Sequence, residues 1–178
     1  LRDEYERVLG DIAAVAPHRP TEDDLRRSIA VFNENRRLIR ELWAIKRDTP
    51  WLLAVDEAYV LLAIGALMPR EEHNALLAGL IPRLGGRQAR RQDKIRVVFE
   101  GGFCEQPPLD LLSVIAQSCY VVDDDLLIGL RYLTSDVDTT GDPLGALAHA
   151  YLERSTYSPV QHDARKPKER MLLERIRA

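Results

Sequence analysis

The chain has 178 residues, of which 46% are hydrophobic and 30% are charged, and its formal net charge at pH 7 is −3. Such a composition is typical of a globular protein, and this length fits one domain or a domain with an accessory lobe. The slightly acidic balance excludes a nucleic-acid-binding protein that relies on a basic face.

The sequence predicts no association with a membrane. The longest apolar candidate for a span, residues 51–68, is interrupted by Asp56 and Glu57, which oppose insertion into a bilayer. The charged start, Leu1–Glu4, is unlike a secretory signal peptide. Because the chain begins with Leu rather than Met, we expect it to be a piece of a longer protein, truncated at both ends.

The cysteine content bounds the redox and metal chemistry. The two cysteines, Cys104 and Cys119, are too few for a disulfide framework and are typical of a reducing, cytoplasmic location. They are also too few to hold a four-cysteine metal centre, so any such centre would need ligands from elsewhere.

Residues 1–94 are predicted to form a mainly helical segment, because apolar residues recur there at helical spacing. Thr21 is a candidate N-cap that is followed by three acidic residues, and Thr49-Pro50 is expected to end the long helix that begins there. Pro69 starts a further helix, in which His73 stands beside acidic residues and is expected to be solvated. The expected helices span residues 1–15, 22–48, 51–67 and 69 to about 82–86.

Residues 95–178 have a different periodicity. Ile95–Phe99 and Cys119–Val122 are short and β-branched, as buried strands are, and a helix is expected between them at 109–117. Strand, helix and strand with short links predict a parallel unit with a right-handed crossover. The predicted fold class is therefore α/β, a helical first half followed by the start of a parallel-sheet, flavodoxin-like βαβ lobe. Further helices are expected at 126–133, 143–154 and 168–178.

The most basic stretch of the chain is Arg83–Lys94. A solvated surface linker is the favoured interpretation, because it lies between the two predicted segments. A contact for a phosphate-bearing ligand such as CoA is the alternative.

Ligands of open parallel sheets bind beyond the carboxyl ends of the strands. The segment after the first predicted strand carries Gly101 and Gly102, which allow a close backbone approach, and then Cys104 and Glu105. We predict that these residues line a substrate cleft, although a tight turn with a buried cysteine would give the same pattern. The segment is no dinucleotide-binding fingerprint.

Three adjacent carboxylates, Asp123–Asp125, follow the second predicted strand. They require compensation by a cation, an arginine or the amides of a helix N-terminus. Helix capping by Asp125 with a salt bridge from Arg131 is favoured over a divalent metal. Strand alternation directs Asp123 and Asp125 to one side, toward the predicted cleft, and Asp124 to the other. Among the histidines, His162 lies in a polar, proline-bearing loop that is either exposed or folded over the cleft.

Several stretches are similar to the benzoyl-CoA reductase/2-hydroxyacyl-CoA dehydratase family, specifically to the C-type of its two cluster-carrying subunits. They follow one another along nearly the whole chain: Arg27–Arg37, Pro69–Leu77, Phe99–Pro108, Val121–Arg131, Asp142–Leu144 and Tyr157–His162.

The resemblance implies a subunit of two α/β lobes around a cleft with a 4Fe-4S cluster, paired with a homologous cluster-carrying subunit. A separate ATP-hydrolysing activase would deliver electrons for reduction of the aromatic ring of benzoyl-CoA, an aromatic acyl-CoA, to a cyclic diene. The family's cluster cysteines lie mainly outside the matched part, so Cys104 is the one candidate metal ligand in a cleft motif. Glu105 and His162 are candidates for proton delivery.

Two other functions are consistent with the sequence. One is the dehydratase branch of the same family, which eliminates water from (R)-2-hydroxyacyl-CoA. The other is a non-catalytic assembly module, in which the helical first half serves as an interface with a partner subunit.

Overall fold

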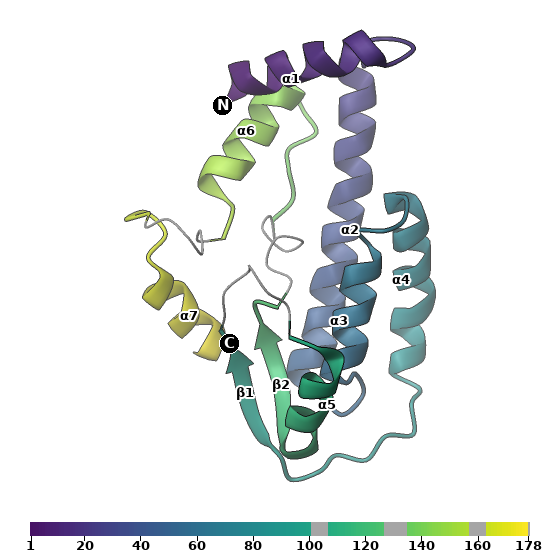
Figure 1. Ribbon diagram of the computed structural model, residues 1–178, viewed down its shortest axis with the longest axis vertical. Coiled ribbons are helices and arrows are strands. Elements are labelled where there is room, and N and C mark those ends of the chain that lie inside the picture. Colours follow the sequence, from purple (N-terminus) through teal and green to yellow (C-terminus); the bar gives the residue numbers. More distant parts are fainter. Residues whose placement is uncertain (101–106, 127–134, 157–162, 178) are drawn as a thin grey trace.

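The computed structural model describes residues 1–100, 107–126, 135–156 and 163–177. Its first half is helical, with α1 (Arg2–Val15), α2 (Glu22–Asp48), α3 (Val55–Ile64) and α4 (Arg70–Leu84). Helix α2 runs along most of the molecule, α3 and α4 lie beside it, and α1 crosses its upper end (Figure 1). The largest cluster of buried apolar side chains joins these helices and comprises Leu38, Ile39, Leu42, Trp43, Leu53, Ala58, Leu62, Leu77 and Leu84.

Capping residues set the start of α2, and a proline sets its end. Thr21 Oγ1 accepts a hydrogen bond from the backbone N–H of Asp24 at 3.2 Å, and Asp24 Oδ2 accepts one from the N–H of Thr21 at 2.7 Å. This reciprocal capping satisfies two amides that a helix N-terminus otherwise leaves without partners. The helix ends at Asp48, just before Thr49-Pro50, as predicted.

Helix α3 is shorter than predicted. Residues 51–53 form a turn and the helix begins at Val55, because Glu57 Oε2 accepts a hydrogen bond from the N–H of Ala54 at 3.1 Å and so caps the helix there. Leu53 precedes the helix and is buried in the main core. The apolar run thus fills the core with a turn as well as a helix.

The second half contains a parallel pair of strands, β1 (Ile95–Phe99) and β2 (Cys119–Asp124), connected by α5 (Leu109–Ser118). The register is regular from Ile95 opposite Cys119 onward and shifts between Val97 and Val98, opposite Val121 and Asp123, so Val122 is an extra residue in β2. Helix α5 packs on the strands, with buried Leu112 of α5 in one apolar cluster with buried Val121 of β2. The predicted α/β fold, with a parallel unit after a helical first half, is confirmed.

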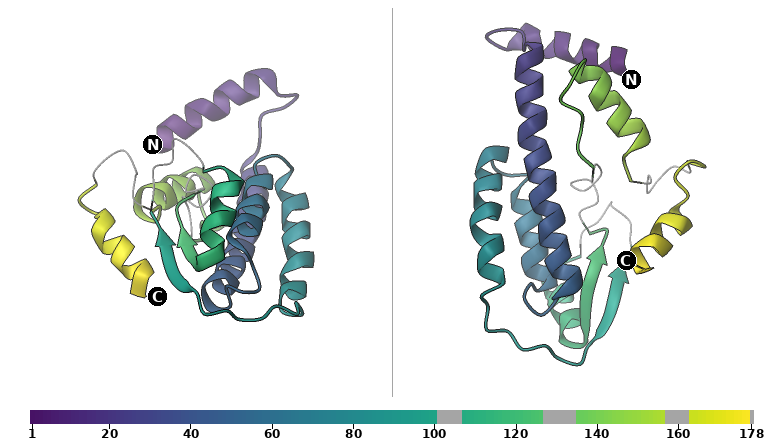
Figure 2. Two further views of the ribbon diagram at one scale, coloured as in Figure 1. Left: turned by 60° about the horizontal axis from the view of Figure 1, so that its bottom comes forward. Right: turned by 180° about the vertical axis from the view of Figure 1, so that it is seen from behind.

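Two further helices complete the described structure, α6 (Pro143–Glu153) and α7 (Lys168–Arg177). Asp142 caps α6, since its side chain accepts from the N–H of Leu144 at 3.1 Å. Helix α6 lies against α1, whereas α7 lies near the carboxyl end of β1 (Figures 1 and 2). The helix expected at 126–133 lies almost entirely outside the described residues. No described helix is long and apolar enough to cross a membrane.

His73 is buried, and the expectation that it is solvated was wrong. Its side chain is 0% exposed, and its ring nitrogens lie 2.9 Å from Asn35 Nδ2 and 2.9 Å from the carbonyl oxygen of Leu61. Asn35 also donates to Asn74 Oδ1 at 2.7 Å and accepts from Arg70 at 3.1 Å. The acidic neighbours of His73 in sequence project from another face of α4, and the histidine joins a polar network between α2, α3 and α4.

We expect acid to destabilise the protein through His73. Burial, together with the nearby charge of Arg70, holds the pKa of His73 below its ordinary value of 6.5, against the opposing hydrogen bond to Leu61. The unfolded chain therefore takes up this proton first, so the stabilisation is present above pH 6.5 and is lost, by up to about 1.4 kcal/mol per pH unit, as the pH falls below it. Urea unfolding at several pH values should show that the free energy of unfolding falls less in acid for His73→Gln than for wild type. His149→Gln, at an exposed helical position, should keep the wild-type pH dependence.

Gly65 is required for close packing of α3 against α4. A Cβ atom at Gly65 would lie 2.5 Å from Cε1 of His73, whereas one at Gly79 would meet nothing within 4 Å. We expect Gly65→Ala to lower the free energy of unfolding by about 1–3 kcal/mol through overpacking. Gly79→Ala, inside α4, should raise it by about 0.5–1 kcal/mol because alanine favours the helix. Equal effects of the two substitutions in urea unfolding would contradict this packing.

Candidate active-site edge of the sheet

Four carboxylates gather at the carboxyl ends of the two strands. Glu100 directly follows β1, and Asp123, Asp124 and Asp125 end or follow β2. Parallel strands bring these segments to one edge of the sheet, and the N–H of Asp125 donates to the carbonyl oxygen of Phe99 at 3.1 Å, which joins the two strand ends. This edge is where open parallel sheets bind ligands. We refer to these four residues as the carboxylate edge.

Asp123 is held from three directions. Its Oδ1 accepts a hydrogen bond from Nε1 of Trp43 at 3.0 Å and another from the N–H of Asp124 at 2.9 Å. Its Oδ2 accepts from Nε of Arg175 at 2.7 Å. Trp43 is a buried core residue of α2, so the indole fixes the position of this carboxylate relative to the helical half.

Asp124 forms a buried ion pair with Lys46 of α2. Their side chains are 5% and 1% exposed. The other oxygen of Asp124 accepts from the N–H of Leu126 at 3.1 Å, and Nζ of Lys46 also lies 4.9 Å from the centre of the Trp43 ring. The lysine charge thus sits between a carboxylate and an aromatic face, away from water.

Helix α7 supplies the cations for the remaining carboxylates. Nη1 of Arg175 lies 2.5 Å from Oδ1 of Asp125 and 3.6 Å from Oε2 of Glu100. Lys168, at the start of the same helix, contacts Oε1 of Glu100 at 2.7 Å. Arg175 therefore bridges the segments that follow both strands, since it contacts Asp123 and Asp125 as well as Glu100.

The contacts of the three aspartates agree in part with the predicted alternation, since Asp123 also contacts α2, through Trp43. Asp123 and Asp125 share the guanidinium of Arg175, while Asp124 contacts Lys46 on α2. Compensation by an arginine was also predicted, but the partner seen here is Arg175. The expected partner Arg131 lies outside the described residues, as do five predicted site residues: Gly101, Gly102, Cys104, Glu105 and His162.

Sequence reasoning missed the residues that compensate the carboxylate edge, which are Trp43, Lys46, Lys168 and Arg175. One signal was available for Lys46. From Leu38 onward the buried positions of α2 are 38, 39, 42, 43 and 46, so Lys46 occupies an apolar stripe. A lysine in such a stripe indicates a buried cation with a partner elsewhere. Arg175 gave no such signal. Helix α7 has no buried residues, so it has no apolar stripe in which a charged side chain would be conspicuous.

The described part of the carboxylate edge can position and polarise a ligand but offers few groups for chemistry. Three cations compensate four carboxylates, and each carboxylate is anchored by at least one partner. Such an arrangement fixes the strand ends and gives the edge a defined electrostatic field. The predicted chemical groups, Cys104, Glu105 and His162, belong to segments outside the described residues, so their roles stay predictions.

The described residues do not themselves form a metal centre. Within the described ranges, no group of three or more His, Cys, Asp or Glu side chains has an arrangement that could hold a metal ion. Cys119 is half-buried at the first residue of β2, at the edge of the sheet opposite the carboxylates.

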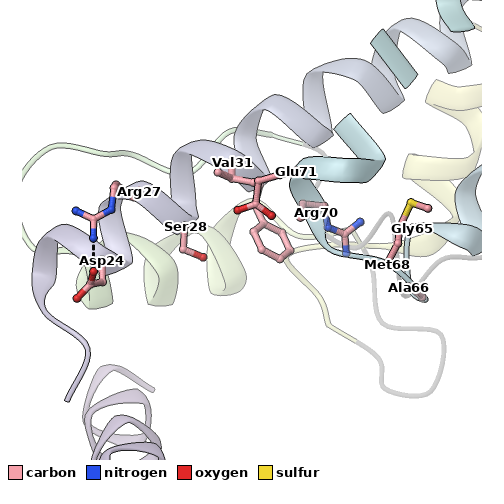
Figure 3. A pocket seen from close by; sticks show the side chains of 10 residues that line it. Asp24, Arg27, Ser28, Val31, Gly65, Ala66, Met68, Arg70 and Glu71 are labelled. Atoms are coloured by element: carbon pink, nitrogen blue, oxygen red, sulfur yellow. Dashed lines mark hydrogen bonds and ion pairs between the residues drawn. The ribbon is translucent and has the colours of Figure 1, made fainter. Parts of the chain in front are cut away.

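Apart from this edge, a hollow of about 540 Å³ lies along α2 and the start of α4 (Figure 3). It is lined by residues from two of the sequence stretches that resemble the family, 27–37 and 69–77. The guanidinium of Arg70 lies 4.8 Å from the centre of the Phe32 ring in this hollow and donates to Asn35 Oδ1. Both arginines that line this hollow have partners: Arg27 pairs with Asp24, and Arg70 is tied to the interior network around His73.

Comparison with known proteins gives consistent results. The family described as "2-hydroxyglutaryl-CoA dehydratase, D-component" matches residues 1–178. The C-type subunit of benzoyl-CoA reductase from Thauera aromatica is 39% identical over 159 residues, which cover 88% of this chain and 41% of that protein. The beta subunit of lactoyl-CoA dehydratase from Anaerotignum propionicum is 30% identical over 177 residues, which cover 98% of this chain and 46% of that protein.

The chain spans less than half the length of these two curated relatives. Within that span, the helical half, the parallel strands and the carboxylate edge all lie in the matched part. The chain therefore belongs to the 2-hydroxyglutaryl-CoA dehydratase D-component family, as its resemblance to the benzoyl-CoA reductase/2-hydroxyacyl-CoA dehydratase family predicted.

Proposed function

We propose that this chain is part of a subunit of an iron-sulfur enzyme that reduces the aromatic ring of benzoyl-CoA to a cyclic dienoyl-CoA at the expense of ATP. The observation that carries the proposal is the 39% identity to the C-type subunit of a benzoyl-CoA reductase, against 30% to a lactoyl-CoA dehydratase subunit. The carboxylate edge supports a positioning role in such a subunit, because charged groups are concentrated where parallel sheets bind ligands.

The proposed enzyme is a cytoplasmic hetero-oligomer. Its partners are a homologous cluster-carrying subunit and a separate activase that hydrolyses ATP and donates electrons. A 4Fe-4S cluster would supply one-electron chemistry. The described residues do not fit such a cluster, since Cys119 stands at the edge opposite the carboxylates and Cys104 lies outside the described residues. The cluster ligands are therefore assigned mostly to segments outside this chain.

For this chain the proposal assigns positioning roles to the described residues. Asp123 and Asp125, held by Arg175, fix the segment after β2 beside the substrate cleft. Gly101, Gly102 and Cys104, which lie outside the described residues, are proposed to line the same cleft. Glu105 and His162 are the proposed proton donors. Replacement of Glu105 by Gln with unchanged turnover would remove that residue from the mechanism.

The dehydratase branch of the family is the second candidate. Two observations favour it: the matching family is described by a dehydratase component, and the similarity to the lactoyl-CoA dehydratase subunit extends over 98% of the chain, compared with 88% for the reductase subunit. The two branches differ in the substrate, so an activity measurement distinguishes them.

The decisive experiment is anaerobic. The complete reading frame is expressed with its partner subunit and activase, and ATP-dependent consumption of benzoyl-CoA is compared with that of a 2-hydroxyacyl-CoA. Formation of the cyclic diene supports the reductase. Turnover of the hydroxyacyl thioester alone assigns the protein to the dehydratase branch. Inactivity on both substrates in a preparation with full iron content would refute both candidates.

A further inference from the structure

A second candidate site lies at the opposite edge of the sheet. A hollow of about 280 Å³ is formed where the loop after α4 enters β1 and where β2 begins. Two aromatic rings, Trp51 and Tyr120, and three cations, Arg91, Lys94 and Arg96, line it. We refer to these five residues as the basic–aromatic hollow. Asp93 adds one negative charge to the lining, so the cations remain in excess.

The cations of this hollow differ from most other arginines of the chain. Among the described residues, Arg91, Lys94 and Arg96 make no ion pair; Lys94 donates to the carbonyl oxygen of Ala116 at 2.5 Å and Arg96 to that of Arg47. Nearby Arg87, by contrast, is paired with Glu57 at 2.7 Å. The chain is acidic overall, with a net charge of −3, so this local excess of positive charge stands out and attracts an anion.

Two of these cations lie over the faces of the aromatic rings. The guanidinium of Arg91 lies 5.6 Å from the centre of the Trp51 ring, and Nζ of Lys94 lies 5.4 Å from that of Tyr120. Arg96 is the register partner of Tyr120 across the parallel strands, which fixes the third cation beside the second ring. An aromatic face next to guanidinium and ammonium groups accepts a planar ring together with a phosphate group.

We propose that the basic–aromatic hollow binds the nucleotide end of a phosphate-bearing ligand, with the base against Trp51 or Tyr120 and the phosphate on the three cations. The volume is close to the lower limit of ligand sites, about 300 Å³, which suits one nucleotide moiety rather than an extended cofactor. The five residues of β1 separate this hollow from the carboxylate edge by roughly 15 Å, so the two sites are distinct.

The proposal does not depend on the proposed function. A free nucleoside diphosphate and the nucleotide end of a CoA thioester both carry the base and the phosphate groups that the hollow is proposed to bind. The test is calorimetric titration of the full-length protein with ADP, CoA and adenosine. ADP should bind at least tenfold more tightly than adenosine, because adenosine lacks the phosphates that the cations recognise. Raised salt concentration should weaken ADP binding.

Substitutions locate the binding. The double variant R91Q/R96Q should bind ADP at least tenfold more weakly, and Trp51→Leu, which keeps all charges, at least fivefold more weakly. The matched control R83Q/R90Q removes the same charge from exposed arginines that do not line the hollow and should stay within about twofold of wild type. Far-UV circular dichroism checks that each variant is folded.

The relative affinities for CoA and ADP distinguish a CoA compound from a free nucleotide as the ligand. Tighter binding of CoA than of ADP, weakened by R91Q/R96Q, assigns the hollow to the nucleotide end of a CoA compound. Equal binding of the two assigns it to a free nucleotide. Unchanged ADP affinity in R91Q/R96Q, equal binding of ADP and adenosine, or no binding of ADP or CoA at millimolar concentration would each overturn the proposal. A protein that binds ADP here but leaves benzoyl-CoA unchanged would retain this site and lose only the proposed function.

Discussion

Replacement of Lys46 by Met is expected to lower the free energy of unfolding by about 3–5 kcal/mol. The lysine and Asp124 are almost fully buried, with side chains 1% and 5% exposed. Methionine keeps much of the side-chain volume but leaves the carboxylate of Asp124 in the interior without its lysine. The cost of an uncompensated buried charge exceeds that of the lost attraction itself. Urea unfolding followed by circular dichroism measures the change.

A matched control lies on the same helix. Arg37 forms ion pairs with Glu34 and Glu41, but its side chain is 45% exposed, so Arg37→Met should cost less than about 1 kcal/mol. Asp124→Asn should also be destabilising, because it leaves the buried lysine charge. The double variant K46M/D124N should then cost clearly less than the two single changes together. Additive effects, or a Lys46→Met variant within about 1 kcal/mol of wild type, would contradict the buried pair.

The boundaries of elements were predictable where a local signal sets them. The capping residue Thr21, the stop at Thr49-Pro50 and the β-branched run Ile95–Phe99 each act within a few residues of chain, and the structure confirms the bounds of all three. The expectation that the first strand is buried was wrong, since Ile95 is 69% exposed and no residue of β1 is buried. The alternation of Asp123 and Asp125 was predictable for the same reason, because strand geometry has a period of two residues.

The contacts that hold the candidate site together were not predictable, because they join distant parts of the sequence. Lys46 and Asp124 are 78 residues apart, and Arg175 and Asp123 are 52 apart. His73 was misjudged for a similar reason: its acidic neighbours in sequence indicated solvent, whereas packing of α4 against α2 and α3 decided its burial. Local patterns determine which face of an element a residue occupies, but not which element covers that face.

The two edges of the sheet also differ in how their charges are satisfied. At the carboxylate edge, cations from α2 and α7 compensate the acids. At the basic–aromatic hollow, Arg91, Lys94 and Arg96 form no ion pair with a described carboxylate, although Asp93 lines the hollow and Arg96 lies near Asp48, which is itself paired with Arg47. The first edge is thus a preorganised structure whose disruption should cost stability, whereas the second has charge available for a ligand, so its substitutions should change binding more than folding.

Arg175→Gln tests the preorganisation of the carboxylate edge. Arg175 contacts Asp123 and Asp125 directly, and its side chain is only 20% exposed, while that of Asp125 is 6% exposed. Glutamine removes the charge and leaves the two aspartates facing each other, which raises their mutual repulsion. We expect the free energy of unfolding to fall by about 2–3 kcal/mol, a value between those for partly exposed and fully buried charged contacts. Because α7 has no buried residues, the loss should appear first as faster amide hydrogen exchange in residues 168–177.

The control for this prediction lies on the same helix. Arg170 pairs with Glu174 one turn away and is 75% exposed, so Arg170→Gln should change stability by less than about 0.5 kcal/mol and leave the exchange of α7 nearly unchanged. Arg175→Lys keeps the charge but cannot reach both aspartates with one planar group, so its exchange rates should lie between those of Arg175→Gln and wild type. If Arg175→Gln and Arg170→Gln gave the same exchange in α7, the guanidinium would not be what holds this helix against the ends of the strands.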